Sequence, residues 1–140
     1  MYKFAIGIKG DRASVGGDMA ELSLKKFMNQ SDALEFNLGV GKRHLWLETM
    51  LHRNNDFKDD LDWYFGAGAD FGYWNTNYDG RYDPSVRSGF WGGTTGVLGL
   101  EYTFNYIPLN FAIDAGPTIR VLPDFQVGLK VSFAFRIAIR

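Results

Sequence analysis

The last sixteen residues of the chain alternate strictly between two kinds of side chain. In FQVGLKVSFAFRIAIR (125–140) every odd-numbered residue is large and apolar, and every even-numbered residue is small, polar or charged. Because successive side chains of a strand point to opposite faces, the segment predicts a strand with one wholly apolar face. A soluble sheet turns such a face inward, whereas a membrane barrel turns it outward to lipid. What this protein does depends on which face meets water.

The same period of two recurs along the sequence and predicts eight strands. We expect them at 2–10, 19–27, 33–41, 45–51, 63–74, 96–104, 109–115 and 125–140. Polar or turn-like segments separate them, notably 54–62, 75–93 and 116–124, and no helical period interrupts the pattern. Eight strands are enough to close an up-and-down barrel that its own side chains fill. We therefore predict a single β-barrel domain over residues 1–140.

Composition excludes several other classes of protein. The 140 residues carry a net charge of −1 and no basic run, so nucleic acid is not an expected partner. Cysteine is absent, which excludes disulfides and thiolate metal sites. No apolar run is long enough for a transmembrane helix, although a membrane β-barrel needs none. No signal peptide is present, so for an exported protein we expect this chain to be the mature form with an initiator Met1.

The second face of the predicted strands combines charged residues with glycine. Exposed to bulk water, so many glycines would weaken the sheet and contribute nothing to packing. Inside a narrow barrel they make room for long side chains, and the nearly balanced acids and bases can pair with one another. We therefore assign this face to a closed lumen. Its predicted charge network comprises Lys3, Lys9, Glu21, Lys25, Glu35, Glu48, Asp70, Glu101, Asp114, Lys130 and Arg136.

The apolar face carries more large side chains than an eight-stranded barrel could enclose, so we assign it to lipid. The predicted fold class is accordingly all-β: an eight-stranded antiparallel up-and-down transmembrane β-barrel. A soluble lipocalin-like barrel that binds an apolar small ligand is the alternative, with its charges on the exterior. Aromatic residues near strand ends match the girdles of membrane barrels. The predicted lipid-facing or girdle aromatics are Tyr2, Phe4, Phe36, Trp63, Phe65, Phe71, Tyr73, Tyr102, Phe104, Phe111, Phe133 and Phe135.

Two stretches carry a resemblance to a known family. GVLGLEYTFNYIPLNFAIDAGP (96–117) and WYFGAGADFGYW (63–74) resemble the small eight-stranded outer-membrane β-barrels of Gram-negative bacteria, the OmpA/OmpX-like class, in a variety common among Bacteroidetes. The resemblance implies a location in the bacterial outer membrane, periplasmic termini and longer loops at the cell surface. Those loops would be the connections near 11–17, 42–44, 75–93 and 116–124. The chain departs from the family in its last two residues, Ile139-Arg140, where such barrels usually end on an aromatic residue.

The irregular segment 75–93 is the expected surface-contact region. Exposed rings and acids there could grip a sugar or a protein, although the rings could equally belong to the interface girdle. The candidates are Tyr78, Asp79, Tyr82, Asp83, Phe90 and Trp91. The expected partners are outer-membrane lipid and lipopolysaccharide, with a surface ligand that the sequence does not identify. We expect a monomer.

Enzymatic and metal-binding roles find weaker support in the sequence. The family includes enzymes acting on lipopolysaccharide, and such an acyl hydrolase needs histidine, serine and an acid together, but only His44 and His52 are available and no serine is obviously placed beside them. NTNYDGRYD (75–83) is similar to the start of an EF-hand loop, but Val86 stands at the position of the required acid. We therefore expect no catalytic residues, no metal and no cofactor. A lipid-modifying outer-membrane enzyme is the second alternative.

Overall fold

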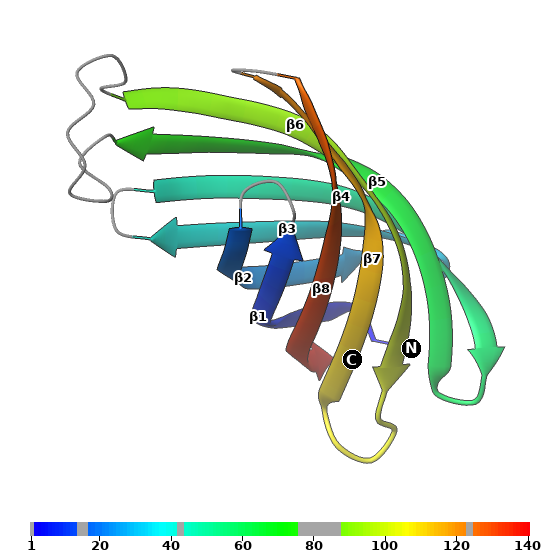
Figure 1. The fold of residues 1–140 in the computed structure, drawn as a ribbon. Coiled ribbons are helices and arrows are strands. Elements are labelled where there is room, and N and C mark those ends of the chain that lie inside the picture. The colour runs from blue at the N-terminus through cyan, green and yellow to red at the C-terminus, as the bar shows by residue number, and fades with distance from the viewer. Residues whose placement is uncertain (1, 14–16, 42–43, 76–87, 123–124) are drawn as a thin grey trace.

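The protein is a closed barrel of eight antiparallel strands (Figure 1). The computed structural model describes residues 2–13, 17–41, 44–75, 88–122 and 125–140. The strands are β1 (Phe4–Ala13), β2 (Gly17–Phe27), β3 (Asp32–Gly41), β4 (His44–Lys58), β5 (Leu61–Asn75), β6 (Ser88–Thr103), β7 (Leu109–Leu122) and β8 (Gln126–Ile139). No helix in the described part of the chain is long and apolar enough to cross a bilayer.

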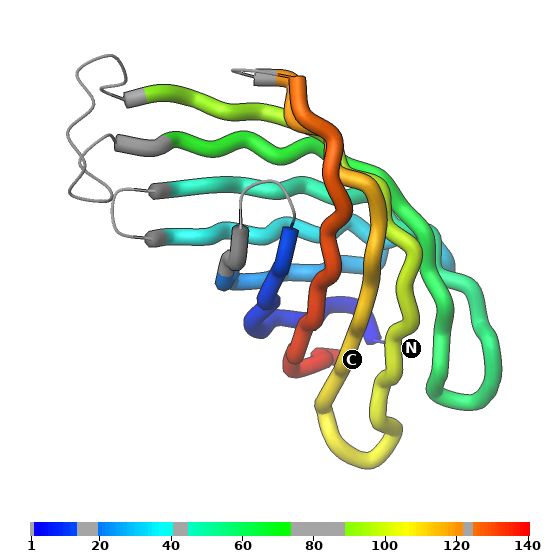
Figure 2. The backbone as a smooth tube through the Cα atoms, viewed as in Figure 1, coloured from blue at the N-terminus to red at the C-terminus, as the bar shows by residue number. Residues whose placement is uncertain are grey.

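Each strand pairs with its neighbours in sequence, and β8 closes the sheet by pairing with β1. Phe4 lies opposite Ile139 in this last pairing, so both ends of the chain lie at the same end of the barrel (Figure 2). The turns between β2 and β3, β4 and β5, and β6 and β7 lie at that end too, which we call the terminal end (Figure 1). The predicted eight-stranded antiparallel up-and-down barrel is confirmed.

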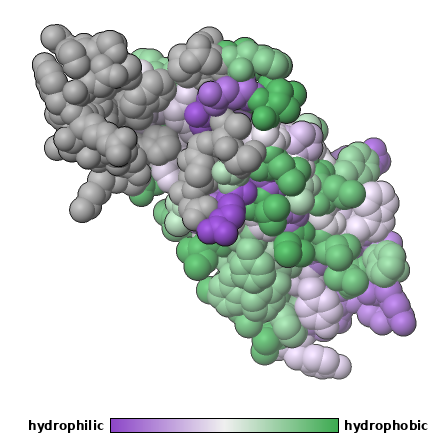
Figure 3. Space-filling view, viewed as in Figure 1, coloured by the Kyte–Doolittle hydropathy of each residue, from purple (hydrophilic) through white to green (hydrophobic). Residues whose placement is uncertain are grey.

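The outer face of the barrel is apolar and the inner face is polar. Leu22 and Val40 are 63% and 72% exposed on the outside, whereas Lys25 and Glu35 are fully enclosed. Apolar side chains cover much of the coloured surface in Figure 3. A soluble protein has the opposite arrangement, because water competes for its charges and expels its apolar surface.

Several strands extend further than the apolar pattern predicts. β4 runs to Lys58 and includes most of the segment expected as a loop at 54–62, and only Asp59 and Asp60 separate it from β5. Asp59 has a φ of 52°, the left-handed conformation of a tight turn. β6 begins at Ser88 and β7 ends at Leu122, so parts of the expected irregular segments 75–93 and 116–124 are strands. Backbone pairing continues where the outer face stops being apolar, so the hydrophobic period underestimates strand length.

Glycines on the inner face lie beside the largest inner side chains. A single register row across β3 to β6 reads Gly39, Trp46, Gly72, Trp91. A Cβ atom on Gly39 would overlap the indole of Trp46, and one on Gly72 would overlap the indole of Trp91. The missing side chains therefore provide the space in which the two indoles lie flat against the barrel wall.

We predict that Gly39→Ala destabilises the barrel, because the added methyl group displaces the Trp46 ring in a packed interior. The free energy of unfolding should fall by about 1–3 kcal/mol. Gly10→Ala is the matched control, since Gly10 points outward and a Cβ atom there meets nothing within 4 Å; its effect should stay within about 0.5 kcal/mol. Urea unfolding in lipid vesicles, followed by tryptophan fluorescence, measures both. Equal effects of the two substitutions would contradict this account of Gly39.

Candidate functional site: the charged lumen

The centre of the lumen is a network of ion pairs around Glu35 on β3. Arg136 Nη2 donates to Glu35 Oε2 at 2.8 Å, and Lys9 Nζ donates to Glu35 Oε1 at 2.8 Å. Lys9 also lies 3.5 Å from Glu48 Oε1, and Arg136 Nε donates to Ser23 Oγ at 2.9 Å. These contacts connect β1, β2, β3, β4 and β8 across the interior, so the network links strands that do not pair with one another.

Toward the terminal end, Glu101 on β6 accepts hydrogen bonds from several strands. Lys25 forms an ion pair with it, Tyr2 donates its hydroxyl to it, and Asn110 Nδ2 donates to it at 2.8 Å. Burial and the nearby Glu101 carboxylate raise the pKa of the Tyr2 hydroxyl well above its usual value. Tyr2 therefore remains a neutral donor, which is what a buried carboxylate needs.

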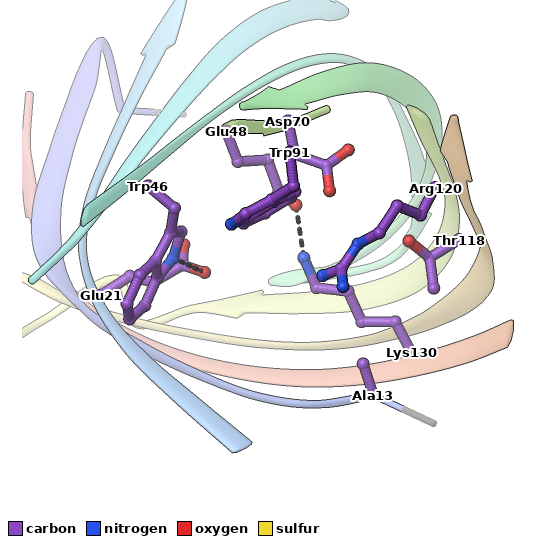
Figure 4. A pocket seen from close by; sticks show the side chains of 9 residues that line it. All are labelled: Ala13, Glu21, Trp46, Glu48, Asp70, Trp91, Thr118, Arg120 and Lys130. Carbon is purple, nitrogen blue, oxygen red and sulfur yellow. Dashed lines mark hydrogen bonds and ion pairs between the residues drawn. The ribbon is translucent and has the colours of Figure 1, made fainter. Parts of the chain in front are cut away.

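At the other end of the lumen, three carboxylates lie near Lys130 on β8. Its ammonium group forms an ion pair with Glu48 on β4 (Figure 4) and another, at 3.1 Å, with Asp11 on β1. Trp46 Nε1 donates to Glu21 Oε1 at 2.9 Å. The cavity beside these groups has a volume of only about 10 Å³. This is room for roughly one water molecule, so side chains fill this part of the barrel.

The structure places most of the predicted lumen charges inside the barrel. Asp70 is half-buried at the edge of the small cavity. The fully buried members are Lys9, Glu21, Lys25, Glu35, Glu48, Glu101, Asp114, Lys130 and Arg136. Lys3 is a wrong assignment, because it is exposed. It lies in a bend before β1, where the alternation of the strand does not hold.

Tyr2 is wrongly assigned to the lipid-facing aromatics. It precedes β1, so the alternation of that strand does not extend to it. It is 3% exposed and points inward to Glu101, not outward to lipid. The other predicted aromatics lie on the outer surface, exposed or half-buried: Phe4, Phe36, Trp63, Phe65, Phe71, Tyr73, Tyr102, Phe104, Phe111, Phe133 and Phe135. Several are stacked or packed edge to face, such as Tyr102 on Phe104 with ring centroids 4.8 Å apart.

The expected surface-contact residues have three different outcomes: four lie outside the described residues, Phe90 is exposed, and Trp91 is buried. Tyr78, Asp79, Tyr82 and Asp83 lie outside the described residues. Phe90 is exposed on the outer face of β6 and stacks on Phe71 with ring centroids 5.5 Å apart.

Trp91 is a wrong assignment to the surface, because β6 already includes it and alternation turns it inward. It is 4% exposed, with the Arg120 guanidinium 4.7 Å from its ring centre.

Sequence reasoning missed much of the uncharged part of the network. Asn37 donates to both Glu35 and Glu48, and Tyr64 donates to Asp114 at 2.5 Å. Asp11, also missed, is buried one step beyond Lys9 on the same face of β1. The period of two identifies all of these inward positions once the strands are extended to their full length, but amides and hydroxyls do not stand out from the pattern by charge.

His52 lies inside the lumen and not at the lipid-facing rim of the barrel, where a lipid-modifying enzyme would need it. It is 1% exposed and stacks on Tyr64 with ring centroids 4.8 Å apart, while its Nδ1 lies 3.6 Å from Glu35 Oε2. A lipid substrate cannot reach a ring enclosed in this way. The side chain of His44 lies outside the described residues.

We predict that Arg136→Met strongly destabilises the barrel, because it leaves buried carboxylates without their shared cation. The loss should be about 3–5 kcal/mol, and restoring charge balance with Glu35→Gln should recover part of it. Lys26→Met is the control, since Lys26 is exposed on the outer face. Urea unfolding in lipid vesicles of the wild-type protein, Arg136→Met, Glu35→Gln, the double variant and Lys26→Met measures these effects. A double variant whose loss equals the sum of the two single losses would show that the pair is not coupled.

No protein-family profile matches this chain, and no curated protein matches it in sequence. Its fold is similar to two solved structures. The N-terminal β-barrel domain of Pseudomonas aeruginosa OprF aligns with a TM-score of 0.63 and 13% sequence identity, over 98% of this chain and 100% of that one. Ail, the attachment invasion locus protein of Yersinia pestis, aligns with a TM-score of 0.51 and 17% identity, over 96% of each chain.

Both of these structures, the N-terminal domain of OprF and Ail, are small outer-membrane β-barrels. At these identities the likeness is one of fold, and it extends over nearly the whole of each chain. The chain therefore has the fold of the small eight-stranded outer-membrane β-barrels, with an antiparallel closed sheet, an apolar outer face and a charged interior.

Proposed function

We propose that this protein is an integral protein of the bacterial outer membrane, without enzymatic activity, that contributes to envelope structure or to surface contact. One observation carries the proposal: a lumen filled by charged side chains lies inside an outer face that is apolar. Lipid is the solvent that such an outer face requires, and a closed barrel satisfies every strand edge within it.

The orientation of the side chains argues against the soluble lipocalin-like alternative. That protein would enclose an apolar cavity and carry its charges outside. Here the largest fully enclosed side chains include Arg136, Lys9 and Lys25, while Ile8 and Leu98 are each 62% exposed. The apolar part of the described interior consists of small packed clusters, one of them around Met50 and Val97, and no apolar cavity for a ligand is described there.

The filled lumen supports an anchor in preference to a pore. Conduction needs a continuous water-filled path, and eight-stranded barrels are just wide enough for their own side chains. The ion pairs of Lys9 and Arg136 with Glu35, and of Lys130 with Glu48, lie across this path. The burial of His52 argues against the lipid-modifying alternative in the same way, because its ring has no access to a substrate.

In this proposal, surface contact is made at the end of the barrel away from the termini. The connection from Asn75 to Ser88 is the longest in the chain and lies at that end, whereas β4 and β5 are joined at the terminal end by Asp59 and Asp60 alone. The exposed rings of Phe71, Tyr73 and Phe90 lie together on the strands next to the long connection. One structural neighbour is named an attachment invasion locus protein. Lipopolysaccharide and an unidentified surface ligand are the proposed partners, and a monomer is the proposed state.

We predict that the protein folds only where its outer face meets an apolar environment. Refolded into detergent and run on a gel without boiling, it should migrate faster than the boiled sample, because the closed barrel resists unfolding by the gel detergent. In detergent-free buffer it should aggregate. A folded monomer in plain buffer would overturn the membrane assignment.

We further predict that the reconstituted protein does not conduct. Planar bilayers that contain the wild-type barrel should show no stable current steps. The Trp46→Ala/Trp91→Ala variant should also show none, because the ion pairs around Glu35 still block the lumen below the removed indoles. Regular current steps from the wild-type protein would contradict the proposed anchor and show that the protein is a channel.

A further inference from the structure

The buried charges of the lumen do not balance. Among the described residues the enclosed carboxylates are Asp11, Glu21, Glu35, Glu48, Glu101 and Asp114. The enclosed cations are Lys9, Lys25, Lys130 and Arg136. A charged His52 would still leave one negative charge in excess, and half-buried Asp70 and Arg120 offset each other. Uncompensated charge is costly in a closed interior, so something besides these side chains must neutralise it.

Part of the excess lies in the half of the lumen away from the termini, while buried Asp114 accepts a hydrogen bond from Tyr64 and has no ion pair among the described residues. Near the terminal end Lys25 pairs with Glu101, and at the centre of the lumen Lys9 and Arg136 both pair with Glu35. At the other end, carboxylate oxygens of Asp11, Glu21 and Glu48 lie within 4.8 Å of one another, contributed by β1, β2 and β4. Lys130 forms ion pairs with Asp11 and Glu48, and within the described residues Glu21 has no ion pair with it.

Oxygens in this cluster have unused capacity to bind a ligand. Asp11 Oδ1 and Glu21 Oε2 are buried without a hydrogen-bond partner among the described residues. The same holds for Ser132 Oγ, which is independent of the acidic cluster. Ser132 is 2% exposed and lies directly opposite Asp11 in the pairing of β1 with β8, which brings a neutral oxygen from a fourth strand to the same place.

We propose that Asp11, Glu21, Glu48 and Ser132 bind one hard divalent cation of the Ca²⁺ class. Carboxylate and hydroxyl oxygens are the ligands that such cations take, and the set contains no nitrogen or sulfur donor that would favour zinc. The adjacent cavity of about 10 Å³, lined by Glu21 and Glu48, has room for a particle about the size of one water molecule. The cation shares Asp11 and Glu48 with the Lys130 ammonium. The inference goes beyond the function proposed above and requires only the closed barrel.

A bound cation would tie four strands of the barrel together, because Ser132 adds β8 to the three strands that carry the carboxylates. Asp11, Glu21 and Glu48 lie on β1, β2 and β4, while β3 separates β2 from β4 in the sheet. The rival neutraliser is a proton shared by the Asp11 and Glu21 carboxyl groups, which would leave no vacancy for a metal. The two accounts differ in whether metal ions bind to the folded barrel.

Terbium luminescence of the full chain, refolded in detergent and freed of metal with a chelator, tests the proposal. Trp46 and Trp91 line the adjacent cavity, so Tb³⁺ bound there should emit when tryptophan is excited (Figure 4). Emission should saturate at one equivalent and be displaced by Ca²⁺. Glu21→Gln and Asp11→Asn should each weaken Tb³⁺ binding by at least about tenfold. Asp62→Asn, at the terminal end, is the control and should leave the affinity unchanged.

The Lys130→Met variant provides a second test that keeps every carboxylate of the site. The result therefore does not depend on whether a carboxylate variant folds. Removing the competing ammonium should strengthen Tb³⁺ binding by about tenfold. Absence of tryptophan-sensitised emission from both the wild-type protein and Lys130→Met would overturn the proposal in favour of the shared proton. An affinity unaffected by Glu21→Gln would place any bound metal elsewhere. The gel shift of each unboiled variant reports folding separately, so failure of the cation site is distinguishable from failure of the membrane barrel.

Discussion

The pairing of β8 with β1 is the constraint on which the rest of the structure depends. It removes the last free edge of the sheet and turns one face of every strand into an interior. That interior is narrow, so its side chains must fill it without overlapping. The alternation of glycine with tryptophan along β3 to β6 is one solution, because each indole occupies the space left by its neighbour's missing side chain.

Closure of the barrel also determines which partners the charged side chains inside it can reach. A lysine or arginine that enters the lumen loses water and must find a carboxylate, and the partner is usually on a strand distant in sequence. Arg136 reaches Glu35 across the barrel, and Lys25 reaches Glu101. Such pairs add little net stability over apolar packing, but breaking one is costly. A lumen built in this way is filled by its own side chains, and this filling is the physical basis of the anchoring role proposed above.

The two halves of the lumen are neutralised differently. Near the terminal end, cations match carboxylates and amide groups such as Asn110 satisfy the remaining oxygens. At the other end the carboxylates outnumber the cations and some oxygens lack partners among the described residues. The unmatched end is also the end that bears the longest connection, so a neutralising ligand there would act next to the region proposed for surface contact.

The period of two in the sequence was sufficient to predict the eight strands, their antiparallel closure and the inward position of residues such as Lys9, Glu35 and Arg136. Alternation is a local property of the strand, so it can be deduced from the sequence. It failed at Tyr2 and Lys3, where a bend precedes β1. It also failed at Trp91, because the first residues of β6 are mostly glycine and polar residues and do not show the apolar alternation of a strand.

Which charges pair, and the meeting of Asp11, Glu21 and Glu48, were decided only by the tertiary structure. Those contacts depend on the register between strands and on closure across the barrel, and no local pattern in the sequence encodes either of them.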